Sequence, residues 1–516
     1  MSNNIGRFIT KRANLNPRAE AIVDVSSGER MTYPQLNARC NRVANALTDA
    51  GLEAGDRVAT LLMNGTAFIE TFFGGAKVGA VTVALNWRLV ADELSFILTD
   101  SGSAVLVFGT AFNDVATELH ERGADGTPVT RWIHVGEPAD RPSFAEGYDD
   151  MLAASSAHEP QADAGGDDLL FIMYTSGTTG LPKGVMHSHD TAMWSAITAN
   201  TTADTRYDDI YLICLPLFHV GALNPLLSIV NLGGTAVIMS EFDPVRIWEL
   251  FDEEHVTVTL AVPAMLQFML LTYDAEKYAH ESLRWVMSGA APVPETLITT
   301  YASMGIEIHQ VYGLTESCGP GCLISPTDAL ERIGSTGKAF FYGDVRIVDE
   351  AGNDVGPHVP GEVLLQGPQL MLGYWNRPDA TAETLVDGWL KTGDIAIFDD
   401  DGFVYIQDRV KDMIISGGEN VYPAEIENVI LGMEGVNEVA VIGMPSETWG
   451  ESPLAVVVRG DESVTAEAVL AWTDGKLARF KQPKAVEFVE MIPRNPTGKV
   501  LKRVLREQFD AMSAGE

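Results

Sequence analysis

Short apolar runs alternate with longer amphipathic segments along most of this chain of 516 residues. Residues 5–50 have the pattern of a helix, a strand and a second helix. A turn and a buried strand follow at 55–63, then a helix at 67–78 and another strand at 79–85. This alternation is typical of α/β layers that are built on largely parallel sheets.

The pattern also predicts buried strands in the middle of the chain. Residues 169–174 form an apolar run directly after Asp167 and Asp168, and the residues from 187 to 202 can form a helix beyond it. Another strand is predicted at 283–287. Residues 123–166 are rich in Gly, Pro, Ala and Asp, and we expect a surface excursion there.

The last fifth of the chain alternates again on a smaller scale. Strands are predicted at 438–442, 454–458 and 486–491, with a helix at 466–479. A unit of about 105 residues lies within the usual size range of a domain. We therefore expect a large N-terminal α/β domain followed by a small α+β domain.

Charge and composition narrow the function classes. Lys and Arg total 35 against 71 Asp and Glu, so the formal charge is 35 − 71 = −36. Nucleic acids and anionic membranes bind basic surfaces, so neither is an expected partner. The sequence has no signal peptide and no apolar run long enough to span a membrane, and we expect a cytoplasmic protein. The four cysteines, Cys40, Cys214, Cys318 and Cys322, are too few for a disulfide framework and lack a zinc-like spacing.

The segment Tyr174–Gly184 carries the clearest chemistry in the sequence. It holds four hydroxyls, several glycines and Lys183, directly after an apolar strand. Small residues let a backbone wrap around an anion, while N–H groups, hydroxyls and an ammonium supply donors, so the segment predicts a polyphosphate site. A flexible linker need not follow an apolar strand or end in Pro-Lys-Gly. A P-loop would need Lys after Gly and before Ser or Thr, a spacing that Lys183 does not have.

Two further segments provide groups that suit a nucleotide. In Gln310–Ser317, Tyr312 offers a ring for stacking on a base, Thr315 a hydroxyl for phosphate or carboxylate, and Glu316 a hard oxygen for Mg²⁺. In Lys391–Asp394, we expect a carboxylate on a tight Gly turn that can accept hydrogen bonds from two ribose hydroxyls. The acidic run Asp399–Gly402, by contrast, is predicted to be a solvated hairpin turn.

Together these segments resemble those of the acyl-adenylate-forming (ANL) superfamily, and in particular AMP-dependent acyl-CoA synthetases such as the fatty-acid–CoA ligases. Tyr405–Glu427 and Pro493–Lys499 match that family as well, so the resemblance spans essentially the whole chain. It implies an adenylate-forming domain at 1–409, a hinge at 410–411 and a mobile lid at 412–516. Lys411 would be the residue about which the lid turns.

The resemblance also implies roles for individual residues. The implied ATP site comprises Thr175, Ser176, Gly177, Thr178, Thr179, Gly180, Lys183, Gly289, Ala290, Ala291, Gln310, Tyr312, Gly313, Thr315, Glu316, Asp394, Arg409 and Lys499. The implied catalytic residues are Lys499, Glu316, Thr175 and His219, and the implied Mg²⁺ ligands are Glu316 and Thr175. The implied acyl pocket comprises His219, Val220, Gly221, Gly313 and Gly319. The implied CoA contacts are Gly417, Gly418, Trp449 and Lys481, the last in a basic patch with Arg479 and Lys484.

The implied reaction has two steps. A carboxylate and ATP give acyl-AMP and pyrophosphate, and CoA then gives acyl-CoA and AMP. Residues 215–239 contain no Asp or Glu, which disfavours an amino acid as the substrate because amino-acid-activating relatives place an Asp near this segment. The first expectation for the substrate is a medium- or long-chain fatty acid, which would place the enzyme in fatty acid metabolism. The second is an aryl or short branched acid.

Several alternatives stay open at this stage. A luciferase-like oxygenase and an enzyme that loads a carrier protein share the same motifs. The oligomeric state is not readable, so a homodimer stays possible. A lone His in apolar surroundings is more often structural than catalytic, which leaves an alternative for His219. His187 and His189 are expected to be surface or capping residues.

Overall fold

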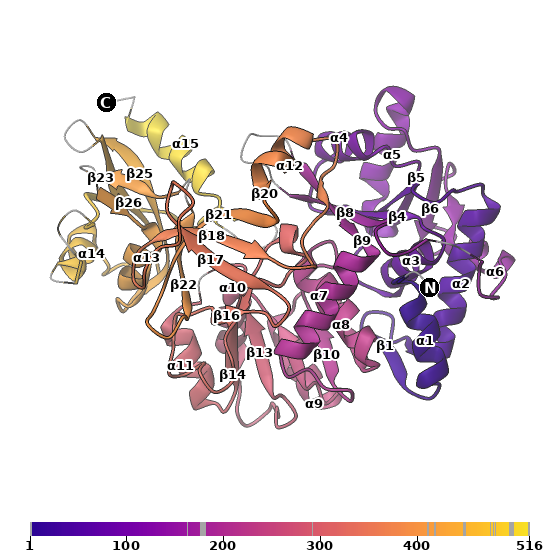
Figure 1. Ribbon diagram of the computed structural model, residues 1–516, viewed down its shortest axis with the longest axis horizontal. Coiled ribbons are helices and arrows are strands. Elements are labelled where there is room, and N and C mark those ends of the chain that lie inside the picture. Colours follow the sequence, from indigo (N-terminus) through magenta and orange to yellow (C-terminus); the bar gives the residue numbers. More distant parts are fainter. Residues whose placement is uncertain are drawn as a thin grey trace.

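A computed structural model describes the elements of this chain (Figure 1). The described residues are 3–161, 164–175, 182–291, 293–409, 412–416, 419–446, 450–474, 476–477, 479, 481–494 and 500–513. Helices alternate with mostly parallel strands in the first two thirds of the chain, so the expected α/β class is confirmed. No helix in this described part combines the length and apolar character that a membrane span requires.

An eight-stranded sheet carries the predicted phosphate segment. Its strand order is β19-β9-β8-β4-β3-β5-β6-β7, and the pairs from β8 to β7 are parallel, whereas β9 and β19 pair in antiparallel fashion. The strands are β3 (Arg57–Leu61), β4 (Val81–Ala84), β5 (Val105–Gly109), β6 (Arg131–Val135), β7 (Glu146–Gly147), β8 (Leu169–Thr175), β9 (Lys183–Ser188) and β19 (Gly373–Tyr374).

A nine-stranded sheet carries the other predicted nucleotide segments of the first 340 residues. Its order is β16-β15-β14-β13-β12-β10-β11-β1-β2, parallel from β14 to β1 and antiparallel at both edges. The strands are β1 (Glu20–Asp24), β2 (Arg30–Thr32), β10 (Ile210–Ile213), β11 (Thr235–Ile238), β12 (Val258–Leu260), β13 (Trp285–Ser288), β14 (Glu307–Tyr312), β15 (Cys322–Leu323) and β16 (Lys338–Ala339).

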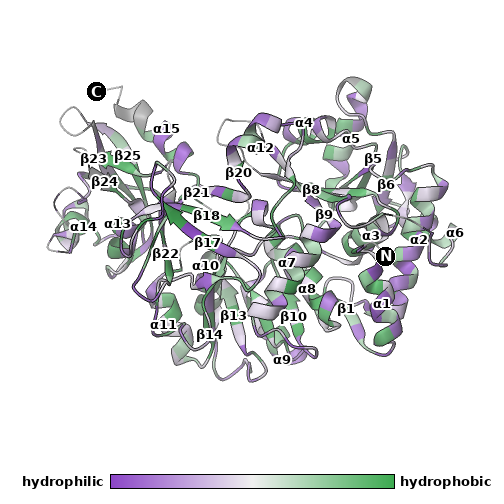
Figure 2. Cartoon of the chain, viewed as in Figure 1, coloured by the Kyte–Doolittle hydropathy of each residue, from purple (hydrophilic) through white to green (hydrophobic). Residues whose placement is uncertain are grey.

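The main core lies between these two sheets. One hydrophobic cluster joins strand residues of both sheets with the buried faces of the helices α2, α3, α7 and α8. In Figure 2, the outward faces of α1 and α2 are hydrophilic while β8 and β13 are largely hydrophobic, as two-sided burial of parallel strands requires. The helices of this part are α1 (Arg7–Leu15), α2 (Tyr33–Asp49), α3 (Thr66–Lys77), α4 (Ala91–Ser101), η1 (Thr110–Phe112), α5 (Asn113–Glu121), η2 (Gly123–Asp125), α6 (Tyr148–Ala154), α7 (His189–Thr202), α8 (Val220–Leu232), α9 (Pro244–Glu253), α10 (Pro263–Thr272), α11 (Glu295–Ser303) and η3 (Thr315–Ser317).

A smaller antiparallel sheet follows, in the order β17-β18-β21-β20 with β22 paired to β21. The turn Asp399–Gly402 joins β21 to β22, as the sequence predicts, and the carboxylate of Asp399 accepts hydrogen bonds from the backbone of Asp401 and Phe403. The elements are β17 (Asp344–Val348), β18 (Gly361–Gln366), α12 (Pro378–Thr384), β20 (Leu385–Val386), β21 (Trp389–Phe398) and β22 (Val404–Arg409).

The C-terminal residues build a fourth sheet with hydrophobic clusters of its own. The order is β24-β23-β26-β25, with β27 paired to β26, and this sheet lies at one end of the molecule in Figure 1. Helices α13 and α14 pack with one cluster and α15 with the other. The elements are β23 (Ile414–Ser416), β24 (Glu419–Val421), α13 (Pro423–Leu431), β25 (Val436–Ser446), β26 (Gly450–Arg459), α14 (Ala466–Thr473), β27 (Ala485–Phe488) and α15 (Lys502–Ser513).

The expected surface excursion at 123–166 is wrong in part. Residues 131–135 form β6, which pairs in parallel with β5, and Trp132 and Ile133 are buried. The Gly, Pro and Asp residues around this short strand obscure it in the sequence. The helix expected at 466–479 is also too long, because α14 ends at Thr473 and Asp474 adopts an extended conformation.

The expectation that His187 and His189 are surface residues is wrong. Both side chains are 0% exposed. Helix α7 begins at His189 and is capped by Ser188, whose hydroxyl accepts a hydrogen bond from the Thr191 N–H. His189 Nδ1 accepts a hydrogen bond of 3.0 Å from the N–H of Ile5, and burial lowers the pKa of His189 to about 4.

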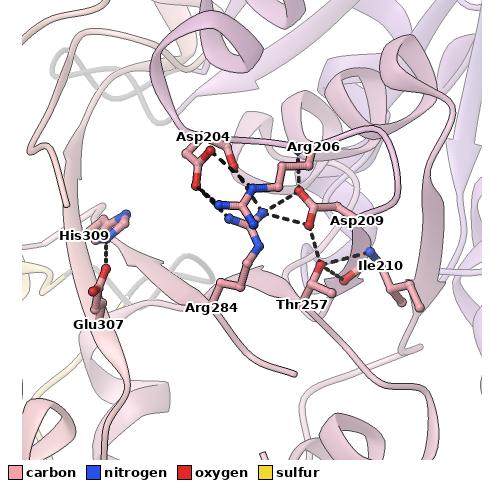
Figure 3. A network of polar contacts seen from close by, with 8 residues as sticks. All are labelled: Asp204, Arg206, Asp209, Ile210, Thr257, Arg284, Glu307 and His309. Atoms are coloured by element: carbon pink, nitrogen blue, oxygen red, sulfur yellow. Dashed lines mark hydrogen bonds and ion pairs between the residues drawn. The ribbon is translucent and has the colours of Figure 1, made fainter. Parts of the chain in front are cut away.

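A network of polar contacts ties the amino ends of β10, β12 and β13 together (Figure 3). Asp209, 2% exposed, receives two hydrogen bonds of 2.7 Å from Arg284 and one of 2.7 Å from the Thr257 hydroxyl. Arg284 also contacts Asp204 at 2.8 Å. The carboxylate of Asp209 is therefore buried but fully paired.

We predict that Arg284→Met lowers the free energy of unfolding by about 3 kcal/mol, because it leaves the Asp209 carboxylate buried without its cation. Urea denaturation measures this change. Arg206→Met is the matched control, since Arg206 is 55% exposed and its guanidinium pairs with the half-exposed Asp204, and it should cost less than about 1 kcal/mol. Equal losses in the two variants would contradict the prediction.

We predict that acid destabilises the fold partly through His189. The pKa of His189 is about 4 in the folded state and about 6.5 in the unfolded chain. Between these two pH values the unfolded state is therefore protonated at His189 and the folded state is not. The stability contribution is fully present above pH 6.5 and declines as the pH falls towards 4, amounting to a loss of about 2 kcal/mol at pH 5. Urea denaturation from pH 7 to pH 5 should show a shallower decline for His189→Gln than for the wild type. Parallel curves would refute this assignment.

Candidate active site

Strands β8 and β9 bring the two ends of the predicted phosphate segment together. They pair in antiparallel fashion, with Thr175 directly opposite Lys183. The connecting residues lie outside the described part of the chain, so phosphate binding by Ser176, Gly177, Thr178, Thr179 and Gly180 stays a prediction. What the structure shows is that the two ends of this segment pair with each other at the end of a buried strand.

An acidic residue that no sequence motif indicates anchors the end of β8. Asp100, at the end of α4, accepts a 2.7 Å hydrogen bond from the Tyr174 hydroxyl and pairs with Arg377 at 2.9 Å. Its backbone carbonyl accepts a 2.9 Å bond from the indole N–H of Trp375. These contacts fix the end of β8 to α4 and to the segment after β19. No local motif could have indicated Asp100, because its partners are 74 and more residues away.

Lys183, Tyr374 and Glu316 meet beside the hairpin. The ammonium of Lys183 lies 5.1 Å from the centre of the Tyr374 ring, and the Tyr374 hydroxyl donates a 2.9 Å hydrogen bond to Glu316 Oε1. Burial, and next the charge of Glu316, raise the pKa of Tyr374 well above its usual value, so the phenol stays a donor. The sequence predicted the cation and the carboxylate but not the ring between them.

The turn that carries Thr315 and Glu316 is folded tightly on itself. A Cβ on Gly313 would lie 1.5 Å from the carbonyl oxygen of Gly319, so no other residue fits without moving the turn. Cys318, with φ 55°, and Gly319, with φ 110°, reverse the chain there. The backbone oxygen of Gly319 fills the space where a side chain of residue 313 would lie. The place of Gly313 in the acyl pocket, which the resemblance implies, stays a prediction.

Tyr312 and Asp394 are joined directly. The Tyr312 hydroxyl donates a 2.7 Å hydrogen bond to Asp394 Oδ2, and burial together with that carboxylate raises the pKa of Tyr312 well above its usual value. The tight turn expected at Asp394 is wrong, because this residue lies inside the long strand β21, next to Gly393 with φ 69°. Asp394 pairs across the sheet with Arg409, whose side chain is not among those described.

The residues predicted for the adenine site come together at the carboxyl ends of β13 and β14. Ser288 pairs with Gln310, and a Cβ on Gly289 would lie 2.2 Å from the Val311 carbonyl oxygen. Ala290 has φ 67°, an uncommon conformation for a residue with a side chain. Gly289, Ala290 and Ala291 therefore follow β13 next to the strand that carries Gln310 and Tyr312, at the strand ends where parallel sheets bind ligands.

The predicted acyl residues lie at the start of α8. His219 precedes the helix, Val220 and Gly221 form its first turn, and Asn224 in the next turn faces Gly319. Burial, and then the charge of Arg88, lower the pKa of His219 to about 3, so its ring is neutral. Its Nε2 is buried and has no hydrogen-bond partner within the described residues. A small interior gap beside this helix is lined by Tyr211, Leu212, Ile213, Cys214, Leu215, Gly221, Ala222, Pro225 and Leu260.

Most of the predicted lid residues lie outside the described part of the chain. These are Lys411, Gly417, Gly418, Trp449 and Lys499, and their roles stay predictions. Lys481 is described, and its ammonium lies 2.7 and 2.8 Å from the two carboxylate oxygens of Glu425. Contact between Lys481 and CoA also stays a prediction, and it would have to compete with this ion pair.

No group of three or more His, Cys, Asp or Glu that could hold a metal occurs within the described residues. The local donors nevertheless suit Mg²⁺, which is usually held by one or two carboxylates together with substrate phosphates. Glu316 offers one such carboxylate and Thr175 one hydroxyl. The donor set fits a metal that arrives with a nucleotide.

Comparison with known proteins agrees with this arrangement. A sequence model described as AMP-binding enzyme matches residues 9–375, and one described as AMP-binding enzyme C-terminal domain matches residues 425–499. The chain belongs to the AMP-binding enzyme family. The second match covers most of the sheet that follows β22 in this AMP-binding enzyme.

Three relatives place the AMP-binding enzyme within its family. It is 46% identical to the long-chain-fatty-acid–CoA ligase FadD13 of Mycobacterium tuberculosis, over 98% of this chain and 99% of that protein. It is 40% identical to a feruloyl-CoA synthase of an Amycolatopsis species, again over 98% and 99%. The solved structure of ATP-bound MatB from Rhodopseudomonas palustris has a TM-score of 0.89 at 32% identity, covering 99% of this chain and all of that one.

We predict that Gly313→Ala lowers the free energy of unfolding by about 3 kcal/mol and abolishes nucleotide-dependent activity, because the added methyl group displaces the turn that carries Glu316. Denaturation and activity assays measure the two effects. Gly356→Ala is the control, since a Cβ there meets no atom within 4 Å and should change neither. A Gly313→Ala enzyme with wild-type stability would contradict the packing argument.

Proposed function

We propose that this AMP-binding enzyme is an ATP-dependent acid–CoA ligase. The observation that carries the proposal is the cluster of Lys183, Tyr374 and Glu316 at the mouth of the β8–β9 hairpin, in a chain that matches both AMP-binding models. Tyr374 contacts both a cation, Lys183, and a carboxylate, Glu316. This pair suits a nucleoside triphosphate with its Mg²⁺, because the cation can bind phosphate and the carboxylate can bind the metal. The similarity to named CoA ligases along almost the whole chain supports CoA as the thiol that accepts the acyl group.

In the first half-reaction, a carboxylate oxygen of the acid attacks the α-phosphorus of ATP and pyrophosphate leaves, which forms acyl-AMP. Lys183, Thr175 and the segment 176–180 bind phosphate, and Lys499 reaches the α-phosphate and the acid. The Tyr312 ring stacks on the adenine beside Gly289, Ala290 and Ala291. Catalysis is then mainly positioning and charge stabilisation. Glu316 and Thr175 would hold Mg²⁺, which would neutralise part of the phosphate charge.

The Tyr312–Asp394 contact supports the proposed ribose site. Asp394 Oδ2 already accepts one hydrogen bond from the Tyr312 hydroxyl, so the carboxylate is held at a fixed angle beside the adenine face. A carboxylate has several further lone pairs, which can accept from ribose hydroxyls. Arg409, which pairs with Asp394 across the sheet, would add a guanidinium towards ribose or phosphate oxygens.

In the second half-reaction, the CoA sulfur attacks the acyl carbon and AMP leaves. We place the domain boundary at 409, the hinge at 410–411 and the lid at 412–516, with alternation of the lid about Lys411 between the two steps. The separate hydrophobic clusters of the C-terminal sheet support a unit that moves as one body. Gly417, Gly418, Trp449 and Lys481 would contact CoA after the movement, and Lys481 would then leave Glu425.

The acid is proposed to be a medium- or long-chain fatty acid. Helix α8, at whose start the predicted acyl residues lie, carries no charged side chain and buries Leu223, Leu226 and Leu227, which suits a hydrocarbon tail beside it. His219, directly before this helix, is neutral and does not add a charge. An aryl acid is the second candidate, because His219 Nε2 has no hydrogen-bond partner among the described residues and could meet a polar ring substituent, and because one relative is named a feruloyl-CoA synthase.

Product mass spectrometry tests the proposal with ATP, Mg²⁺, CoA and a panel of acids from butyrate to palmitate plus cinnamate and benzoate. We expect acyl-CoA together with an equal amount of AMP, highest for the longer fatty acids. Glu316→Gln, purified in the same way, should form neither and so controls for host ligases. Acyl-AMP without acyl-CoA would favour a carrier-loading enzyme or an oxygenase, and absence of AMP with every acid would overturn the proposal.

A further inference from the structure

We propose that His187 is a positioning residue for the adenylation step, in which its ring N–H holds the Thr315 carbonyl and thereby sets the place of Glu316 relative to Lys183. This inference rests on the proposed function, because it assigns the step that the contact serves. From the sequence, this histidine was expected only to be a surface or capping residue. The observations that support a role are its burial and its two ring contacts.

The ring of His187 is enclosed between two parts of the proposed site. It lies on β9, is 0% exposed and packs against Phe171 of β8 with 5.0 Å between ring centres. Nε2 lies 2.8 Å from the backbone oxygen of Thr315, and Nδ1 lies 3.2 Å from the Thr191 hydroxyl. A buried polar ring that is satisfied on both sides has a defined orientation.

Counting protons fixes which nitrogen is the donor. The Thr315 oxygen can only accept, so Nε2 must carry the hydrogen. Burial lowers the pKa of His187 to about 4, so the ring holds one proton and Nδ1 can only accept. Its partner is the Thr191 hydroxyl at 3.2 Å, whose one hydrogen is shared between Nδ1 and the Ser188 carbonyl oxygen at 3.1 Å. Thr191 Oγ1 in turn accepts from the Ser188 N–H at 3.0 Å. The chain of contacts therefore selects one tautomer and aims it at Thr315.

This bond connects the turn of Glu316 to the strand of Lys183. The Thr315 oxygen also accepts the N–H of Cys318 within the turn, at 3.0 Å, so His187 uses its second lone pair. The backbone oxygen of Glu316 accepts a hydrogen bond of 2.9 Å from the N–H of Met371, and the Tyr374 hydroxyl donates to the Glu316 carboxylate. Tyr374 thus fixes the side chain of Glu316, whereas His187 fixes the backbone just before it.

Three variants separate positioning from structure. His187→Met removes the donor at similar volume, and His187→Gln keeps a donor that can replace Nε2–H. His189→Met removes the neighbouring buried histidine, which bonds to Ile5 and not to the turn. Each is assayed for ATP–pyrophosphate exchange at saturating acid, as a function of Mg²⁺-ATP concentration, together with its melting temperature.

We expect His187→Met to slow the exchange at least about tenfold through a lower kcat or a raised KM for Mg²⁺-ATP, which corresponds to the loss of one oriented hydrogen bond. His187→Gln should restore most of the rate. His189→Met should lower the melting temperature with the kinetic constants for Mg²⁺-ATP unchanged. Wild-type exchange kinetics in His187→Met, or equal losses in the Met and Gln variants, would overturn the inference.

A second measurement stands even if a variant fails to fold. Nitrogen-15 NMR of the ring in the wild-type enzyme should show the neutral Nε2–H tautomer at pH 7. A protonated ring or the Nδ1–H tautomer would overturn the inference. If the wild-type enzyme forms no acyl-AMP from any acid, the proposed function fails, whereas an active wild type with an indifferent His187→Met variant refutes only the role of His187.

Discussion

Where β8 and β9 run side by side, Thr175 faces Lys183 across an antiparallel pair, and the rest of the site is arranged around that pairing. Asp100 holds the outgoing end of β8 through Tyr174. Strand β19 pairs with β9 and so brings Tyr374 over Lys183. The turn of Glu316 belongs to the other large sheet, and side-chain contacts from β9 and β19 join it to this one. A shift of the hairpin would therefore move donors that belong to both sheets.

The electrostatics of this protein work at two scales. At long range a formal charge of −36 repels the anions that the proposed reaction uses, ATP and CoA. At short range the proposed site has the ammonium of Lys183, and the predicted phosphate segment would add hydroxyls and backbone N–H groups, all of which act with little screening at contact distance. Neutral buried histidines and phenols around it hold their positions through hydrogen bonds and add no net charge.

The sequence could predict the elements and residues that carry local patterns. Short sequence motifs were enough to predict the strand before the phosphate segment, the nucleotide-binding groups of Tyr312 and Glu316, and the family. It could not predict the residues whose meaning depends on distant partners. Asp100, Tyr374 and His187 look ordinary in the chain, and each acquires a role through contacts 58 to 128 residues away. Strand β6 was missed for a different reason, since its five residues lie among turn-forming neighbours.

The start of α8 has a wider consequence. Three of the proposed acid-binding residues, His219, Val220 and Gly221, lie at the start of α8, which touches the Glu316 turn at Gly319 but contributes no group to the Lys183, Tyr374 and Glu316 cluster. Side chains at the start of this helix can therefore change in size and polarity while the cluster keeps its geometry. Such independence lets one scaffold diversify over many acids during evolution, and it makes α8 the natural segment for an engineer who wants a new acid without rebuilding the nucleotide site.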